Sequence, residues 1–187
     1  MIVFWIVLGV VALLLVAGFV SYNRFVRQRQ LIKDAWANID TELKRRIDLI
    51  PNLIETVKGY AAHEREVLER LTAARAAAIA GSATPGGSAA AENALAAALR
   101  SVFAVAEAYP DLKASANFVE LQHELANTED RLQAARRFYN GNVRDYNTRV
   151  NSVPSNVIAR MGGFTPKEFF EVDDAVRDAG PPKGDFS

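Results

Sequence analysis

Residues 2–20 read IVFWIVLGVVALLLVAGFV, and no charged side chain interrupts them. A helix of this length rises about 28 Å at roughly 1.5 Å per residue, close to the thickness of the hydrocarbon core of a bilayer. The stretch decides the architecture, because the rest of the chain then has to fold at a membrane surface. We therefore predict a transmembrane anchor at residues 1–21.

A basic segment follows the apolar stretch at once. Its positive side chains are Arg24, Arg27, Arg29 and Lys33, and the first acidic residue is Asp34. Basic flanks stay on the cytoplasmic side, which predicts an outer N-terminus and a cytoplasmic body. The same side chains would hold the body against anionic lipid at about 1 kcal/mol each. The alternative is a signal peptide cleaved near Ala17. It is disfavoured because nothing basic precedes the apolar run, which is also longer than a usual signal core.

Composition narrows the class of protein. The chain has 187 residues, a formal net charge of zero and no cysteine. That length leaves room beyond the anchor for one domain of ordinary size. Zero net charge disfavours a nucleic-acid partner, and the lack of cysteine removes disulfides, thiolate chemistry and a lipid-modified cysteine. Alanine is abundant and strand-type alternation is missing, so we expect an all-α chain.

Beyond the anchor, residues 21 to about 80 show helical spacing. Apolar positions recur mostly in steps of three and four, as in a helix packed along one face. They are Ile32, Trp36, Ile39, Leu43, Ile47, Ile50, Ile54, Val57, Ala61, Leu68, Leu71 and Ala78. Pro51 lies within this pattern and has no backbone donor, so we predict one long helix with a kink or a short break near residues 49–50.

Two further helices are expected. A turn-rich linker at residues 81–88 (GSATPGGS) precedes a helix over about 89–108. The next helix begins at an N-cap, Ser115 or Asn117, and extends to about residue 152. Its apolar stripe follows a heptad pattern with one additional step of four, as in a coiled coil. The members are Phe118, Leu121, Leu125, Thr128, Leu132, Ala135, Tyr139, Val143, Tyr146, Val150 and Val153.

Together these elements predict an elongated antiparallel bundle of long helices, continuous with the transmembrane helix and occupying residues 22–170. A short helical turn at residues 155–161 follows the last long helix. Residues 171–187 are acidic and contain two consecutive prolines, which indicates a disordered tail. The apolar faces of all the helices exceed what one helix pair can bury, so we expect a homo-oligomer.

Several stretches resemble the LemA family of bacterial membrane proteins. They are RQLIKDAWANID (29–40), LKRRIDLIPNLIETVKGYAAHE (43–64), LQHELANTEDRLQAARRFYN (121–140), VRDYN (143–147) and VPSNVIARMGGF (153–164). With the anchor they cover nearly the whole chain, although Val153 departs from the phenylalanine that is frequent in the family. The resemblance implies a helical bundle at the bacterial inner (cell) membrane with a cytoplasmic body. It implies no accepted catalytic mechanism, and a magnetosome-associated relative points to membrane organisation.

Two sets of polar residues invite a chemical interpretation. His63 and His123 could meet if the long helices pair antiparallel, but a helical zinc pair needs ligands at i,i+4, so we predict surface histidines and no metal site. A second set near the middle of the long helices could act as acid and base, although a layer that fixes helix register is favoured. Its members are Arg45, Arg46, Asp48, Asn52, Asn127, Glu129 and Asp130. One of the two arginines is expected to pair with Glu129 or Asp130.

A third set consists of two aromatic–amide pairs. Tyr139-Asn140 and Tyr146-Asn147 lie on one face of a helix, about two turns apart. Such pairs suit the seam of a bundle with hydrogen-bonded hydroxyls, which we favour, or a face that binds a partner.

The sequence contains no phosphate-binding glycine loop, nucleophile elbow, paired cysteine and histidine, or redox motif. We therefore expect no enzyme activity and no cofactor. The favoured hypothesis is a single-pass scaffold that self-associates, contacts the lipid bilayer and organises membrane or membrane-protein partners. One alternative is an adaptor or sensor arm that relays an envelope signal to a protein partner, with Pro51 as its switch. A hydrolase or metal enzyme built on the carboxylates is the other.

Overall fold

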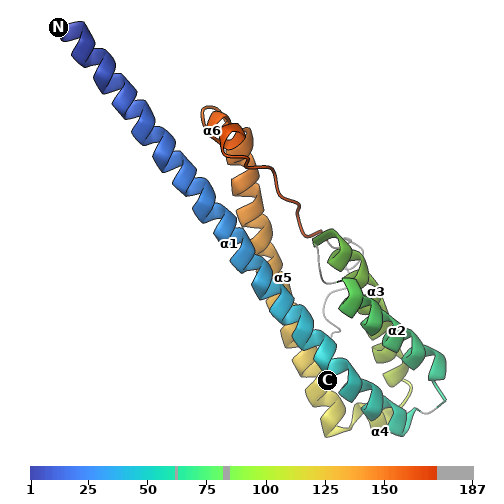
Figure 1. Ribbon diagram of the computed structural model, residues 1–187. Coiled ribbons are helices and arrows are strands. Elements are labelled where there is room, and N and C mark those ends of the chain that lie inside the picture. The colour runs from blue at the N-terminus through green and yellow to red at the C-terminus, as the bar shows by residue number, and fades with distance from the viewer. Residues whose placement is uncertain (62, 82–84, 172–187) are drawn as a thin grey trace. The chain divides into compact units, whose positions relative to one another are not determined.

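The computed structural model describes residues 1–61, 63–81 and 85–171. Every regular element in these ranges is a helix, which confirms the all-α class (Figure 1). The helices are α1 (Ile2–Tyr60), α2 (Arg65–Gly81), α3 (Pro85–Ala106), α4 (Pro110–Lys113), α5 (Ala116–Asn151) and α6 (Ser155–Met161).

The chain divides into two compact units. The first contains Met1–Ala37 and Arg137–Glu168, and the second contains Asn38–Arg136 and, of the described residues after Glu168, Phe169, Phe170 and Glu171. Both α1 and α5 therefore contribute residues to each unit.

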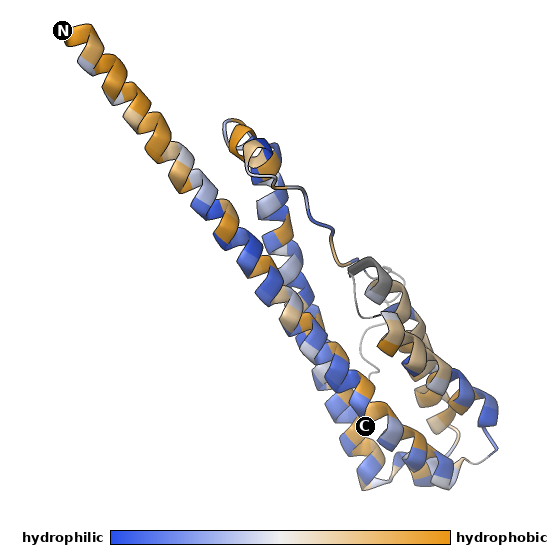
Figure 2. Ribbon diagram, in the orientation of Figure 1, coloured by the Kyte–Doolittle hydropathy of each residue, from blue (hydrophilic) through white to orange (hydrophobic). Residues whose placement is uncertain are grey.

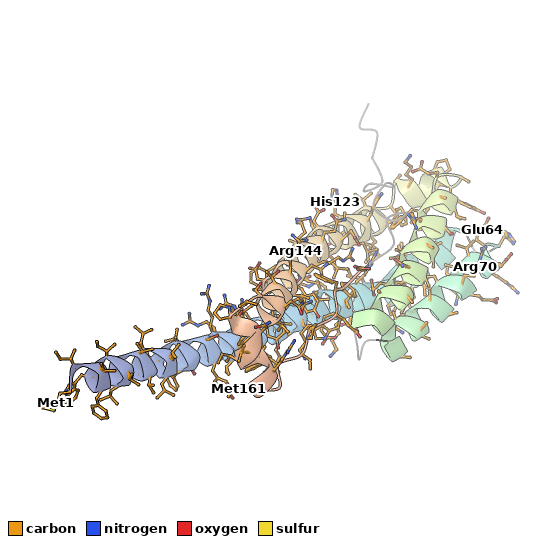
Figure 3. The ribbon with its side chains drawn as sticks, turned by 90° about the horizontal axis from the view of Figure 1, so that it is seen from above. Met1, Glu64, Arg70, His123, Arg144 and Met161 are labelled. Atoms are coloured by element: carbon orange, nitrogen blue, oxygen red, sulfur yellow. The ribbon has the colours of Figure 1, made fainter. Side chains whose placement is uncertain are left out.

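In the first unit, the N-terminal part of α1 is uncovered. Side chains along residues 2–17 are exposed, and none of the most apolar window of the helix is buried within the chain. Figure 2 shows this part of α1 as almost continuously apolar, and Figure 3 shows its side chains projecting on all sides. A helix that is apolar all round requires an apolar surrounding, so residues 2–20 have the length and character of a membrane span.

Beyond the span, α1 and α5 pair antiparallel within the first unit. Phe25 contacts Tyr146 with ring centroids 6.0 Å apart. Further along α1, Trp36 contacts Tyr139, which lies earlier in α5, at 5.5 Å. From the first contact to the second, the residue number increases along α1 and decreases along α5, so the two helices run antiparallel.

The second unit contains an apolar core to which all of its helices contribute. The members of this core are Ile47, Ile50, Leu53, Val57, Ala61, Leu68, Leu71, Ala78, Leu95, Leu99, Val102, Ala106, Leu112, Phe118 and Leu125. The stripes predicted from periodicity are confirmed, because nearly all of their positions are buried or half-buried. Val153 is the exception, with 82% of its surface exposed.

The prediction of a single helix from residue 21 to about 80 is wrong. α1 ends at Tyr60 and α2 begins at Arg65. The buried residues of α2 belong to the same core as the buried residues of α1 from Ile47 onward, so the turn folds the second part of the stripe back onto that core. The sequence carries a weak signal of this turn, because the stripe passes from Ala61 to Leu68 without an intervening step of three or four.

Pro51 does not break α1, contrary to the short break considered near residues 49–50. A proline has no N–H to donate, so it frees the carbonyl four residues earlier. That carbonyl belongs to Ile47, and Nε of Arg75 in α2 donates a hydrogen bond to it over 3.1 Å. Pro51 thus provides an acceptor through which α2 is tied to α1 within the second unit.

The linker predicted at residues 81–88 is also shorter in the structure. α3 starts at Pro85, where proline is well accommodated because the N–H groups of the first helical turn have no partner within the helix. α3 ends at Ala106, and Pro110 opens α4. Residues 82–84 of the predicted linker and residues 172–187 of the predicted tail lie outside the described residues.

Candidate functional site

An ion cluster joins α1, α3 and α5 inside the second unit. Arg46 lies 2.9 Å from a carboxylate oxygen of Glu92 and 3.1 Å from one of Glu129. The side chains of Arg46 and Glu92 are 9% and 4% exposed, whereas that of Glu129 is 26% exposed. Charges removed from water have to be paired, and one guanidinium has enough donors to serve two carboxylates. The cluster therefore fixes the register of three helices.

Burial controls the protonation of Glu92. Desolvation raises the pKa of this carboxyl above its ordinary value, and attraction and hydrogen bonding by Arg46 oppose that rise without cancelling it. The negative charge of Glu129 adds to the rise. A raised carboxyl pKa is one mark of a catalytic acid. Both carboxylates are engaged by the same guanidinium, however, which is the arrangement of a structural ion cluster.

The structure brings together part of the predicted polar layer. Arg46 and Glu129 are in contact across α1 and α5. The other members, Arg45, Asp48, Asn52, Asn127 and Asp130, are exposed. Arg45 instead lies 3.7 Å from Glu42, one turn earlier on its own helix. The exposed carboxylates of this set are therefore not the buried acid and base that the catalytic interpretation required.

Sequence reasoning missed Glu92, the third member of the cluster. It lies in AAAENALAAALR (89–100), a stretch so apolar that α3 has the length and composition of a membrane span. A third of that window, 33%, is buried within the chain, and three leucine and valine side chains of α3 belong to the core. A lone carboxylate in an apolar helix is the signal that could have found it, since burying an unpaired charge is costly.

One residue of each Tyr–Asn pair, Tyr139 and Asn147, holds the chain after α6 onto α5 within the first unit. The hydroxyl of Tyr139 donates to the carbonyl of Glu168 over 2.9 Å. The amide of Asn147 donates to the carbonyl of Lys167 and accepts from its N–H, both over 2.8 Å. We call residues 164–168, which these side chains hold, the strap.

Within the chain, the candidate partner face is largely covered. Tyr139 and Tyr146 are 3% and 1% exposed, and burial raises the pKa of both hydroxyls. Asn140 and Asn147 are half-buried. The tyrosines are thus part of the seam between helices, as the favoured interpretation expected, and they are covered by the chain itself.

The strap begins with an aromatic stack that depends on two glycines. Phe164 stacks on Phe25 with ring centroids 4.8 Å apart. Gly163 has a φ of +67°, a conformation that glycine adopts without strain, and there the chain turns out of α6. A Cβ on Gly162 would lie 2.5 Å from the Phe164 ring. Both glycines are therefore required, one for its backbone conformation and one for space.

Positive charge is concentrated after the span. Arg24, Arg27, Arg29 and Lys33 are all exposed, and the guanidinium of Arg29 lies 5.6 Å from the centre of the Phe164 ring. Arg149 of α5 adds a further charge, and burial followed by repulsion from Arg24 lowers its pKa. We call Arg24, Arg27, Arg29 and Lys33 the basic collar. Positive charge in this position is suited to anionic headgroups beside a span.

His63 and His123 are exposed. Among the residues that the structure describes, no group of three or more histidine, aspartate or glutamate side chains is placed to hold a metal ion. Neither histidine belongs to the ion cluster, whose chemistry is that of two carboxylates and a guanidinium.

Comparison with known proteins adds three findings. The sequence profile of the LemA family matches residues 35–186. Magnetosome protein MamQ 2 of Paramagnetospirillum magneticum is 25% identical over 194 residues, which cover 88% of this chain and 71% of the relative. Protein LemA of Metamycoplasma hominis is 25% identical over 158 residues, covering 83% of this chain and 71% of the relative. The profile match includes the ion cluster and the strap, and the apolar stretch precedes it.

Proposed function

The chain belongs to the LemA family, and from this premise we propose that it is a single-pass, membrane-anchored helical scaffold. In this role it self-associates and organises the membrane or membrane-protein complexes without catalysing a reaction. One observation carries the proposal: α1 continues without a linker from the uncovered apolar stretch into the packed seam of the first unit. A folded unit that shares a helix with its span follows every tilt of that span, which suits a protein that shapes or spaces a membrane.

The internal polar groups support a structural role. The carboxylates of Glu92 and Glu129 are engaged by Arg46. Tyr139 and Asn147 are engaged by the strap. The name of one relative is compatible with this role, because MamQ 2 is named as a magnetosome protein.

The proposal includes a location. We place the span in the bacterial inner membrane, with the N-terminus outside and the remainder of the chain in the cytoplasm. The exposed basic collar supports this orientation, because lysine and arginine close to a span are retained on the cytoplasmic side.

Self-association is supported by apolar surface that the chain leaves uncovered. Besides the span, Phe138 on α5 is 55% exposed. A second copy that covered this ring would remove it from water, which is favourable for a large aromatic side chain. Phe138→Ser should therefore weaken the assembly, whereas Thr148→Ser, at an exposed position of the same helix, should leave it unchanged.

The test is the mass of the full-length protein in mild detergent, combined with electron cryotomography of cells that overproduce it. We expect masses of more than one chain, together with ordered assemblies or reshaped membrane. Monomers at every protein concentration, on flat membrane, would contradict the proposal.

The sensor alternative required Pro51 to act as a switch. The carbonyl that this proline frees is bound by Arg75 of α2, so the position is held by a neighbouring helix. We therefore propose the scaffold alone.

A further inference from the structure

The end of α5 and the helix α6 leave large apolar side chains uncovered. Val153 is 82% exposed, Val157 55% and Met161 81%. Val153 occupies the position at which the apolar stripe of α5 would continue, and Val157 and Met161 are four residues apart on one side of α6. We call these three side chains the α6 face.

The α6 face lies beside the membrane span. The Cδ1 of Ile158, in α6, is 3.7 Å from the position that a Cβ on Gly18 would take. Phe164, just after α6, contacts Tyr22 with ring centroids 5.3 Å apart. Gly18 belongs to the uncharged stretch, so α6 packs against the last turns of the span. Figure 3, in which Met161 is labelled, shows α6 against α1.

The chemistry of this segment matches the boundary between lipid headgroups and acyl chains. Residues 150–164 contain one charged side chain, that of Arg160, and no acidic one. Arg24 and Arg27 are exposed on α1 in the same unit, and Arg149 lies close enough to Arg24 for the two positive charges to repel each other. At such a boundary, apolar side chains enter the acyl region while arginines reach the phosphates.

We propose that α6 and the turn at Val153 form an interfacial membrane element, in which lipid covers Val153, Val157 and Met161 next to the span. Lipid is favoured over a second copy of the chain for two reasons. The α6 face is continuous with the span through the packing of Ile158 at Gly18, and the charges around it are positive, as anionic headgroups require.

This element gives the first unit a second attachment to the bilayer. A single span can rotate and tilt, and anchors at the interface restrict both motions. With α6 in the headgroup region, the span and the end of α5 are held together at the membrane surface. The inference rests on α1 spanning the membrane and does not depend on self-association.

The test uses single-cysteine variants of the full-length chain, which contains no cysteine of its own. Met161→Cys and Val157→Cys probe the α6 face, Thr148→Cys is the exposed control on α5, and Leu13→Cys reports the span. Each variant carries an environment-sensitive fluorophore in vesicles of phosphatidylcholine and phosphatidylglycerol. Quenching is measured with iodide in water and with lipids that bear a nitroxide near the headgroup end of the acyl chain.

We expect the lipid nitroxide to quench the Met161 and Val157 labels several-fold more than the Thr148 label. Iodide should quench the Thr148 label more than the Met161 and Val157 labels. The proposal is overturned if iodide reaches the Met161 and Thr148 labels equally, since the face would then be in water. It is also overturned if neither quencher reaches the Met161 label, because protein would then cover it. For Leu13, near the middle of the span, the nitroxide is placed near the methyl end of the acyl chain. Failure of that quenching would instead remove the anchor on which both proposals depend.

Discussion

At the scale of single residues, the carbonyl of Ile47 shows how a helix tolerates an internal proline. Pro51 removes the N–H that would bind this carbonyl, and Arg75 replaces it from α2 with a bond of 3.1 Å. A backbone N–H at position 51 would also satisfy this carbonyl, so the loss of Arg75 would then leave no unpaired acceptor. The effect of replacing Arg75 should therefore depend on the residue at position 51.

A double-mutant cycle measures this coupling. Arg75→Met keeps the aliphatic stem and leaves the Ile47 carbonyl without its donor, so we expect a loss of about 1–2 kcal/mol in the free energy of unfolding. In a Pro51→Ala background the residue 51 N–H satisfies that carbonyl, and the same change should cost much less. Denaturant unfolding of the full chain in detergent, followed by circular dichroism, measures both values. Arg70→Met, on the exposed side of α2, is the matched control, and equal costs of Arg75→Met in the two backgrounds would refute the coupling.

Glu92 predicts a pH dependence of stability. Its pKa in the folded chain is raised above the ordinary carboxyl value of 4.5, so the folded state holds the proton more tightly than the unfolded state. The contribution of this group to stability is therefore fully present below about pH 4.5 and is lost as the pH rises through the raised pKa. Glu92→Gln stays neutral, so its stability relative to the wild type should increase as the pH rises above that value.

The matched variant in the same cluster is Arg46→Met. It leaves two carboxylates facing each other without their cation, so we expect a loss of about 3–5 kcal/mol near neutral pH, decreasing as acid protonates them. Unfolding curves at several pH values compare the two variants with the wild type. A Glu92→Gln protein that grows less stable than the wild type with rising pH would show that attraction by Arg46 outweighs desolvation.

At the scale of elements, the strap depends on a side chain that imitates a backbone partner. Asn147 both donates to and accepts from Lys167, as a neighbouring strand would. Asn147→Asp keeps the acceptor but places a carboxylate against the carbonyl of Lys167, so the strap should open at a cost of about 1–3 kcal/mol. Hydrogen exchange of the peptide that covers residues 164–168 should then accelerate. Asn151→Asp is the control, because that side chain bonds only within α5, and equal acceleration in both variants would contradict the role of Asn147.

The elements also show which parts of this fold are readable from sequence. The apolar stripes of α1 and α5 repeat at the helical period, and burial follows them closely because every position obeys the same local rule. Local periodicity does not predict the start of α2, the role of Glu92 or the strap. Glu92 and Arg46 are 46 residues apart, and Lys167 and Asn147 are 20 apart, so their pairing depends on tertiary packing that no local pattern encodes.

At the scale of the whole molecule, the proposed orientation in the membrane rests on the basic collar. Positive side chains within about 15–20 residues of a span determine which end is retained in the cytoplasm. All four residues of the collar are exposed, and Arg24, Arg27 and Arg29 are the nearest to the span, so their charge is available for this purpose. Residues 2–20 between them carry no charged side chain.

The topology can be tested with a membrane-impermeant maleimide on spheroplasts. We expect Ile2→Cys to react in intact spheroplasts and Thr148→Cys to react only after lysis. Replacing Arg24, Arg27 and Arg29 with glutamine should raise the intact-cell reaction of Thr148→Cys several-fold, because a fraction of the chains then inserts in the reverse direction. Replacing Lys44, Arg100 and Arg131, which are also exposed but far from the span in sequence, removes equal charge and should change nothing. Equal effects of the two triple variants would assign orientation to net charge. Reaction of Thr148→Cys in intact spheroplasts, with the collar unmodified, would place the body outside.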